Sequence, residues 1–406
     1  MVKRLSELTG AERKRLLERG LEIDRVLPVV KNIFIDVEKN GDAALRKYTK
    51  KFDGADVANF AVSEDEISSA TRSMDKNLVE QMKFAARNIV SFHKKQVKTS
   101  WESEVISGIF LGQKIVPLGT VGAYIPKGYF STALMTVIPA KLAGVKRIVL
   151  CTPPGKNGKV DAKVLVAADI AGADEIYKVG GAQAIAAMCF GTESVPKVEK
   201  IAGPGNAYVT AAKVLARTQV EIDFPAGPSE IAIVADGSAD ADFVAADLLS
   251  QLEHGKDSLA VLLTDSAELA KKVERKTKGT GIFLVDTVDE AVEFINECAP
   301  EHLELIVKNP LKVMEKVENA GSVLVGNYAP AAASDYASGA NHVLPTAGYA
   351  KVFSALGVND FTKSITVQRI EKEGLEKIRD TVVRLARAEG MKKHAESVDV
   401  RFRRKK

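Results

Sequence analysis

Short apolar segments alternate with segments of helical periodicity along most of the chain. Runs rich in β-branched and aliphatic residues predict strands at residues 147–151, 231–235, 259–263, 282–285, 303–307 and 322–325. Apolar residues at helical spacing predict helices at residues 75–95, 238–253, 267–276, 288–298 and 371–388. Strands that are apolar along their whole length are typical of parallel sheets with helices on both faces. We therefore predict an α/β fold built from doubly wound sheets.

Glycine and proline residues divide this pattern into parts. They cluster at residues 117–128, 153–158, 180–181, 203–205 and 225–228. Residues 121–228, between the first and last clusters, have their own alternation of strands and helices, which predicts a domain inserted into a larger one. Ser238 is expected to cap the helix at 238–253, because its hydroxyl can accept a hydrogen bond from a free backbone amide.

Composition and charge exclude several classes of protein. The 406 residues are 46% hydrophobic, and 57 basic against 53 acidic side chains leave a net charge of only +4. This balance argues against a nucleic-acid-binding protein, and the basic tail at residues 401–406 is interpreted as a solvated terminus. No segment has the roughly 18 uninterrupted apolar residues of a membrane span, and the N-terminus lacks the apolar core of a signal peptide. We expect a cytoplasmic enzyme without membrane or nucleic-acid partners. Cys151, Cys189 and Cys298 lie in apolar or helical segments and predict buried, reduced thiols.

Two glycine turns are candidates for nucleotide binding. Residues 179–184 (VGGAQA) and 202–207 (AGPGNA) each follow an apolar run and precede a helix-like segment. Glycines at such a turn let backbone amides approach a pyrophosphate at the N-terminus of the helix. Neither turn completes a G-x-G-x-x-G pattern, and no P-loop is present. Tight strand-to-helix turns and a degenerate dinucleotide site both remain open.

The scarce histidines suggest a metal site. Gln251 and His254 are three residues apart at a predicted helix end, which Gly255 terminates, so both side chains share one face. Asp335 and His342 lie in a loop of small residues, and His394 lies near the C-terminus. Nitrogen and oxygen ligands without thiolate fit Zn²⁺, with Mn²⁺ or Co²⁺ as substitutes. Any one of these histidines is also explained by a structural hydrogen bond, and their spacing alone does not assemble a site.

An acid–base pair is the third candidate. Glu301 and His302 adjoin at the start of a predicted strand. Neighbours in an extended strand point to opposite faces, whereas in a turn both can face one cleft, and Pro300 favours such a turn. A base that titrates near neutrality beside a carboxylate suits the oxidation of an alcohol and then an aldehyde. His93, in a predicted helix, is expected to be a solvated surface residue.

Taken together, these residues resemble the histidinol dehydrogenase family. The resemblance lies in seven segments that follow one another along the chain: 180–185 (GGAQAI), 190–198 (FGTESVPKV), 203–207 (GPGNA), 225–230 (PAGPSE), 250–255 (SQLEHG), 300–303 (PEHL) and 334–346 (SDYASGANHVLPT). It implies a zinc-dependent enzyme that uses NAD⁺ twice. The implied reaction oxidises L-histidinol through L-histidinaldehyde to L-histidine, the last step of histidine biosynthesis.

The resemblance also implies roles for individual residues. The implied zinc ligands are Gln251, His254, Asp335 and His394, and the implied catalytic pair is Glu301 and His302. The implied substrate contacts include these residues together with Ser229, His342 and Glu389. Tyr124, Gln183 and Asn206 match positions that bind NAD.

The fold that the resemblance implies has two incomplete Rossmann-like domains with small helical extensions. We expect the first domain at residues 20–120 and 229–354, carrying most zinc and catalytic residues, and the NAD-binding domain at residues 121–228. Residues 1–19 and 355–406 are expected to form extensions for dimerisation. The expected partner is a second copy of the chain, whose C-terminal segment completes a shared active site. A zinc-dependent hydrolase, a dehydrogenase of a related amino alcohol and a non-catalytic nucleic-acid-binding protein are the alternatives.

Overall fold

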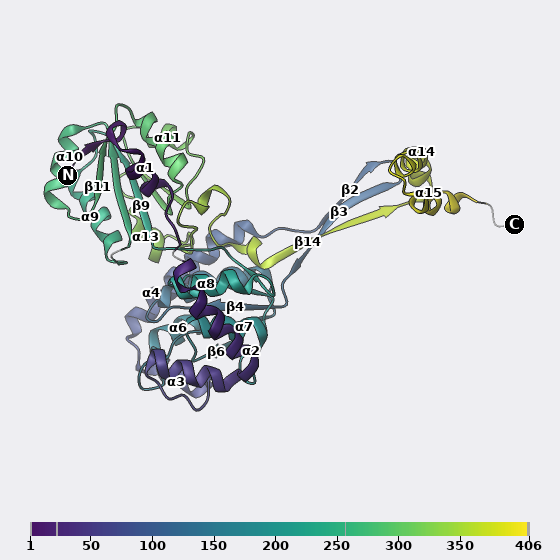
Figure 1. The fold of residues 1–406 in the computed structure, drawn as a ribbon, viewed down its shortest axis with the longest axis horizontal. Helices are drawn as coiled ribbons and strands as arrows, with labels where there is room; N and C mark the ends of the chain where they lie inside the picture. The colour runs from purple at the N-terminus through teal and green to yellow at the C-terminus, as the bar shows by residue number, and fades with distance from the viewer. Residues whose placement is uncertain (1, 22, 256, 404–406) are drawn as a thin grey trace. The chain divides into compact units, whose positions relative to one another are not determined.

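The computed structural model describes residues 2–21, 23–255 and 257–403. Its chain divides into two units: unit one comprises Met1–Val97 and Leu118–Phe361, and unit two comprises Lys98–Pro117 and Thr362–Lys406. Unit one contains two parallel sheets, each with helices on both faces (Figure 1). The predicted α/β class with parallel sheets is therefore confirmed.

The first sheet of unit one has six parallel strands in the order β1-β11-β10-β9-β12-β13. Their bounds are β1 Lys3–Arg4, β9 Glu230–Ala235, β10 Leu259–Thr264, β11 Gly281–Leu284, β12 His302–Ile306 and β13 Ser322–Val325. Alternate residues of β9 point to opposite faces, so Ile231 and Ile233 join one core while Ala232 and Val234 join another. Burial on both faces explains why these strands are apolar throughout.

Helices cover both faces of this six-stranded sheet. α9 (Ala241–Leu252) and α10 (Ala267–Lys276) contribute to one core, and α11 (Val288–Cys298) to the other. The shorter helices α1 (Gly10–Leu17), α12 (Pro310–Met314) and α13 (Ala331–Tyr336) complete this half. The predicted cap at Ser238 is wrong, because its amide and hydroxyl both bind Asp236, and Asp240 caps α9 instead.

The second sheet has five parallel strands in the order β6-β5-β4-β7-β8. Their bounds are β4 Thr120–Tyr124, β5 Arg147–Cys151, β6 Glu175–Tyr177, β7 Lys200–Ala202 and β8 Glu221–Ile222. On one face, α2 (Ile23–Asp53), α7 (Gly181–Phe190) and α8 (Ala207–Ala216) form a core, and on the other α4 (Lys76–His93), α5 (Phe130–Ala143) and α6 (Ala162–Ala171) form a second. α3 (Glu64–Ser73) packs beside α6.

The N-terminal helices pack on the five-stranded sheet. Residues 20–120 are predicted to belong with the six-stranded sheet; in the structure α2 packs on α7 and α8, and α4 packs on α5. The apolar stripe of α2, which includes Val30 and Val37, is buried there. β1, which lies in the predicted N-terminal extension, pairs with β11 at the edge of the six-stranded sheet.

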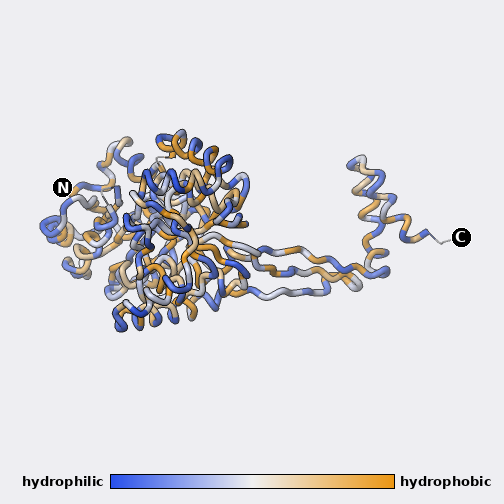
Figure 2. Tube along the Cα trace, turned by 90° about the horizontal axis from the view of Figure 1, so that it is seen from below, coloured by the Kyte–Doolittle hydropathy of each residue, from blue (hydrophilic) through white to orange (hydrophobic). Residues whose placement is uncertain are grey.

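Unit two is an antiparallel sheet with two helices. Its strands are β2 (Trp101–Ile106), β3 (Ile109–Pro117) and β14 (Thr362–Ile370), in the order β14-β3-β2, followed by α14 (Lys372–Ala388) and α15 (Lys392–Asp399). Hydrophobic and hydrophilic residues alternate along these segments (Figure 2). Several apolar side chains of this unit are exposed, including Trp101 at 53% and Leu385 at 62%. Short 3-10 helices occur at Leu5–Glu7, Lys94–Gln96, Tyr349–Lys351, Val358–Phe361 and Val400–Phe402.

Several smaller predictions are also resolved. All three cysteines are free and buried, as expected. His93 is completely buried, so its predicted exposure is wrong: Nδ1 donates to the Ile89 carbonyl (2.9 Å), and Nε2 accepts from Asn341 Nδ2 (3.3 Å). Among the described residues, no helix is long and apolar enough to cross a membrane. In the basic tail, Arg401 and Arg403 are exposed, while residues 404–406 lie outside the described residues.

Candidate functional site

The acid–base pair lies where β9 and β12 begin. Glu301 Oε2 accepts a hydrogen bond from the Glu230 amide (2.7 Å), and His302 Nδ1 lies 3.3 Å from the Glu230 carbonyl oxygen. Glu301 Oε2 and His302 Nδ1 are 3.6 Å apart, and both side chains are buried. The left-handed conformation of Ala299 (φ 48°), just before Pro300, turns the chain into β12. The sequence left open whether the two side chains point to opposite faces or toward one cleft. In the structure they lie together.

Asp335, on α13, approaches the same imidazole from the other side. Its Oδ1 lies 3.4 Å from His302 Nε2, and this nitrogen has no hydrogen-bond partner among the described residues. Burial by itself would lower the pKa of His302, but the carboxylates of Glu301 and Asp335 outweigh it and raise the pKa to about 10. His302 is thus held by two carboxylates and one backbone carbonyl.

His342 is fixed next to this group. Its Nδ1 donates to the Asp335 carbonyl (2.8 Å), and its Nε2 lies 3.1 Å from the hydroxyl of Thr132 on α5. Burial lowers the pKa of His342, which favours its neutral form. Thr132 carries no signal in the sequence, because its contact with His342 joins segments 210 positions apart.

The other predicted metal ligands are only partly assembled. Gln251 is buried at the end of α9, and its Nε2 has no partner among the described residues. His254 is exposed just after α9. Burial would raise the pKa of Asp335, but contact with His302, followed by the weaker effects of His342 and His254, lowers it. No cluster of three or more His, Cys, Asp or Glu side chains able to hold a metal occurs within the described ranges. Glu389 and His394 belong to unit two, where both are exposed.

The predicted NAD contacts lie at the carboxyl ends of strands in the five-stranded sheet. Tyr124 ends β4, and its hydroxyl accepts a hydrogen bond from the Gly181 amide (3.1 Å). Gln183 is buried on α7, and neither atom of its side-chain amide has a partner among the described residues. Asn206 caps α8 by accepting from the amides of Tyr208 and Val209. Tyr124 is thus the last residue of β4, while Gln183 and Asn206 follow β6 and β7.

A buried ion pair holds the glycine turn that precedes α8. Lys213 Nζ contacts Asp223 and also donates to the Gly203 carbonyl (2.9 Å), while the Gly203 amide donates to Asp223 Oδ2 (2.8 Å). Gly203 has φ +125°, and a Cβ there would lie 2.1 Å from the Tyr124 carbonyl oxygen. Close packing thus requires glycine at this position, so the turn is structural whether or not a nucleotide binds. Sequence reasoning missed the pair, because a lysine at helical spacing is usually a solvated residue.

Asp53 at the end of α2 is a second residue that the sequence did not indicate. One of its carboxylate oxygens is buried without a partner among the described residues, and its charge raises the pKa of Tyr124 after the larger effect of burial. Burial raises the pKa of Asp53 itself to about 6, against the effect of Lys127. A titratable carboxyl therefore adjoins the predicted cofactor residues.

The two halves of unit one meet through loops that carry these residues. Ser229, Glu230, Glu301 and His302 lie at the amino ends of β9 and β12, whereas Tyr124, Gly181 and Asn206 lie at carboxyl ends of the other sheet. Contacts of His342 with Thr132 and of Thr346 with the Gly227 amide (2.5 Å) connect these edges. Ligands of open α/β sheets bind beyond the carboxyl ends of the strands, next to where the strand order reverses. Here that edge of one sheet adjoins the acid–base pair of the other.

Comparison with known proteins identifies the family. The family model described as histidinol dehydrogenase matches residues 17–402. The chain is 47% identical to histidinol dehydrogenase of Methanosarcina mazei, covering 99% of this chain and 98% of that protein. It is 49% identical to the Archaeoglobus fulgidus protein of the same name, covering 95% and 98%. The crystal structure of histidinol dehydrogenase from Elizabethkingia anophelis superposes with a TM-score of 0.94 at 39% identity, covering 99% and 97%. The chain therefore belongs to the histidinol dehydrogenase family.

Proposed function

We propose that this protein oxidises L-histidinol through L-histidinaldehyde to L-histidine, with two molecules of NAD⁺ and a zinc ion, in the cytoplasm. Membership of the family supports the substrate and the reaction. The mechanism rests on one observation: Glu301 and His302 lie together beside Asp335, with Glu301 Oε2 3.6 Å from His302 Nδ1. A carboxylate and an imidazole in contact are the groups that two successive oxidations require.

The predicted zinc ligands supply a suitable set of donors. Gln251, His254 and Asp335 offer an amide oxygen, an imidazole nitrogen and a carboxylate, all of which Zn²⁺ accepts. Gln251 is buried at the end of α9, so its amide oxygen is available to a cation, while its unpartnered Nε2 can only donate to a hydrogen-bond acceptor. The negative charges of Glu301 and Asp335 raise the pKa of His302, and a cation at Asp335 would offset part of that charge. We propose that these three residues and His394 hold the metal.

The NAD⁺ site is proposed at Tyr124, Gln183 and Asn206. The unpartnered amide of Gln183 offers a donor and an acceptor for a polar ligand. Both sheets have the order 3-2-1-4-5 when their main strands are numbered along the chain, which supports their description as incomplete Rossmann-like domains. In that description residues 121–228 bind NAD⁺, and the six-stranded sheet carries the acid–base pair.

Residues of the chain then move the protons. When bound, zinc would orient the substrate, and NAD⁺ would accept the hydride in each oxidation. His302 Nε2, which has no hydrogen-bond partner within the described part of the chain and lies 3.4 Å from Asp335 Oδ1, takes the hydroxyl proton of histidinol in the first oxidation. Glu301 activates the water that hydrates the aldehyde, and His302 takes the proton of the hydrate in the second oxidation. Ser229, His342 and Glu389 are proposed to contact the substrate, and holding it in place is itself a large rate factor.

A second copy of the chain is the proposed partner. Unit two exposes apolar side chains on its sheet and helices, among them Trp101, Val105, Ile365, Leu385 and Met391. Exposed apolar patches of this kind are typical of surfaces that another molecule covers. We propose that unit two reaches the second copy and that Glu389 and His394 complete the site of that copy.

The test of this mechanism separates the two oxidations. In Glu301→Gln, the rate of histidinaldehyde oxidation should fall much more than the rate of histidinol oxidation, because only the aldehyde must first be hydrated. Glu293→Gln, which changes an exposed carboxylate of α11, serves as the matched control and should leave both rates unchanged. Equal slowing of both oxidations in Glu301→Gln would contradict the role assigned to Glu301.

A further inference from the structure

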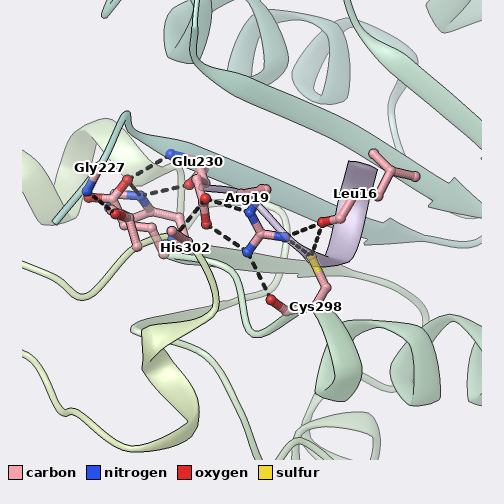
Figure 3. Close-up of polar contacts among 9 residues, drawn as sticks. Leu16, Arg19, Gly227, Glu230, Cys298 and His302 are labelled. Atoms are coloured by element: carbon pink, nitrogen blue, oxygen red, sulfur yellow. Dashed lines mark hydrogen bonds and ion pairs between the residues drawn. The ribbon is translucent and has the colours of Figure 1, made fainter. Parts of the chain in front are cut away.

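Glu230 holds both members of the acid–base pair through its backbone. Its amide donates to Glu301 Oε2 (2.7 Å), and its carbonyl oxygen lies 3.3 Å from His302 Nδ1. A displacement of residue 230 would therefore move the carboxylate and the imidazole together. Residue 230 opens β9, where it pairs with Leu259 of β10, and its side chain meets Arg19 (Figure 3).

The side chain of Glu230 is held by an arginine from the N-terminal segment. Arg19 Nε donates to Glu230 Oε1 (2.6 Å) and Arg19 Nη2 to Glu230 Oε2 (3.1 Å), a two-point contact. Both side chains are largely removed from solvent, with exposures of 12% for Arg19 and 4% for Glu230. The Ala347 amide donates to Glu230 Oε1 as well (2.9 Å). Burial raises the pKa of Glu230, and the charge of Arg19 offsets only part of this effect.

Arg19 also holds the segment that leads into Glu301. Its Nη2 donates to the Cys298 carbonyl at the end of α11 (2.8 Å), and its Nη1 to Cys298 Sγ (2.9 Å) and to the Leu16 carbonyl. Ala299, the next residue, has the left-handed conformation that turns the chain toward Glu301. All five N–H groups of the guanidinium are thus used, in directions that a lysine cannot reproduce.

We propose that Arg19 is a positioning residue for the acid–base pair. Its single planar side chain contacts two segments. One is residue 230 at the start of β9, whose backbone contacts both members of the pair, and the other is residue 298, which precedes Glu301 and β12. Within the described residues, Arg19 forms no hydrogen bond or ion pair with Glu301 or His302, so it acts through residues 230 and 298. This inference rests on the proposed function, which assigns Glu301 and His302 to catalysis.

The experiment compares Arg19→Ala with Arg13→Ala. Arg13 lies on α1 and forms an exposed ion pair with Glu297 of α11, so its loss perturbs the same two helices without reaching the pair. At a temperature well below unfolding, Arg19→Ala should lower kcat for histidinol oxidation roughly tenfold to a hundredfold, while KM for histidinol and the zinc content stay near those of the unchanged protein. Arg13→Ala should keep kcat.

Chemical rescue distinguishes positioning from general stability. Guanidinium ion, added below the concentration that unfolds the protein, should restore part of kcat in Arg19→Ala and none in Glu230→Gln, which retains its arginine. A folded Arg19→Ala with unchanged kcat, or a loss that guanidinium does not repair, would overturn the inference.

Two further outcomes are decisive. If Arg19→Ala does not fold, Arg19→Lys and Glu230→Gln take its place: a lowered kcat with unchanged KM supports the inference, and an unchanged kcat overturns it. If the unchanged protein forms no NADH from histidinol, the proposed function fails, whereas an active protein with an equally active Arg19→Ala overturns only the role of Arg19.

Discussion

Replacing Lys213 by methionine should destabilise the protein strongly, although the substitution keeps the length and most of the volume of the side chain. Lys213 is 2% exposed and Asp223 is 0% exposed, so no water replaces the lost ammonium group. Asp223 would keep hydrogen bonds from the amides of Gly203 (2.8 Å) and Phe224 (2.7 Å) but would lose the only ion pair that it forms within the described ranges. The Gly203 carbonyl would lose its bond from Nζ (2.9 Å).

The magnitude follows from this geometry. Removing one partner of a buried ion pair costs about 3–5 kcal/mol, because the remaining charge stays buried and uncompensated. Domains of this size lose roughly 2–4 °C in melting temperature per kcal/mol, so a decrease of about 6–20 °C is expected. Since Lys213 and Asp223 both hold Gly203, the KM for NAD⁺ should also increase.

Thermal unfolding followed by circular dichroism measures the effect, with Arg217→Met as the matched control. Arg217 lies just after α8 and forms an ion pair with Glu221 in which both side chains are 53% exposed. Such pairs contribute about 0–1 kcal/mol, so the control should unfold close to the temperature of the unchanged protein. Equal melting temperatures for Lys213→Met and Arg217→Met would refute the reasoning about the buried pair.

Three other predictions concern the site and its surroundings. His302→Ala should abolish histidinol oxidation while zinc content stays near normal, and loss of the metal would contradict a proton-transfer role. His93, whose pKa burial lowers from its ordinary value of 6.5, should destabilise the folded protein as pH falls below about 6.5, because only the unfolded histidine binds the proton readily. Urea unfolding should therefore show a shallower loss of stability toward low pH in His93→Gln, and parallel curves would refute this. Mixed dimers of His254→Ala and His394→Ala subunits should regain part of the activity, whereas heterodimers without activity would contradict shared sites.

Local pattern was sufficient to predict β9 to β13 of the six-stranded sheet and the helices α9, α10 and α11. The predicted strand at 322–325 and the helices at 267–276 and 288–298 have the observed bounds. In each of these segments the spacing of apolar residues can be recognised from the local sequence alone. β2, β3 and β14 escaped prediction, since they mix charged and apolar residues and most side chains of β2 and β14 are exposed. The error at Ser238 arose because Asp236 competes for its hydroxyl and amide.

Long-range packing accounts for what the sequence could not reveal. The apolar stripe of α2 predicts burial but not which sheet it covers. His93 looked like a surface residue because Asn341, which covers it, is 248 positions away. Likewise, the motif at 300–303 indicated Glu301 and His302 but not their convergence, which depends on the backbone at Ala299 and on contacts with Glu230. The sequence did not indicate a positioning role for Arg19, because its partners come from three separate segments of the chain.

The most direct test of the proposed function counts products. Purified protein is supplied with L-histidinol and excess NAD⁺, and NADH formed is compared with histidinol consumed, with and without a metal chelator. The account predicts two NADH and one L-histidine per histidinol, and loss of turnover with the chelator that added Zn²⁺ restores. One NADH per histidinol with release of the aldehyde, or turnover unaffected by removal of the metal, would contradict it.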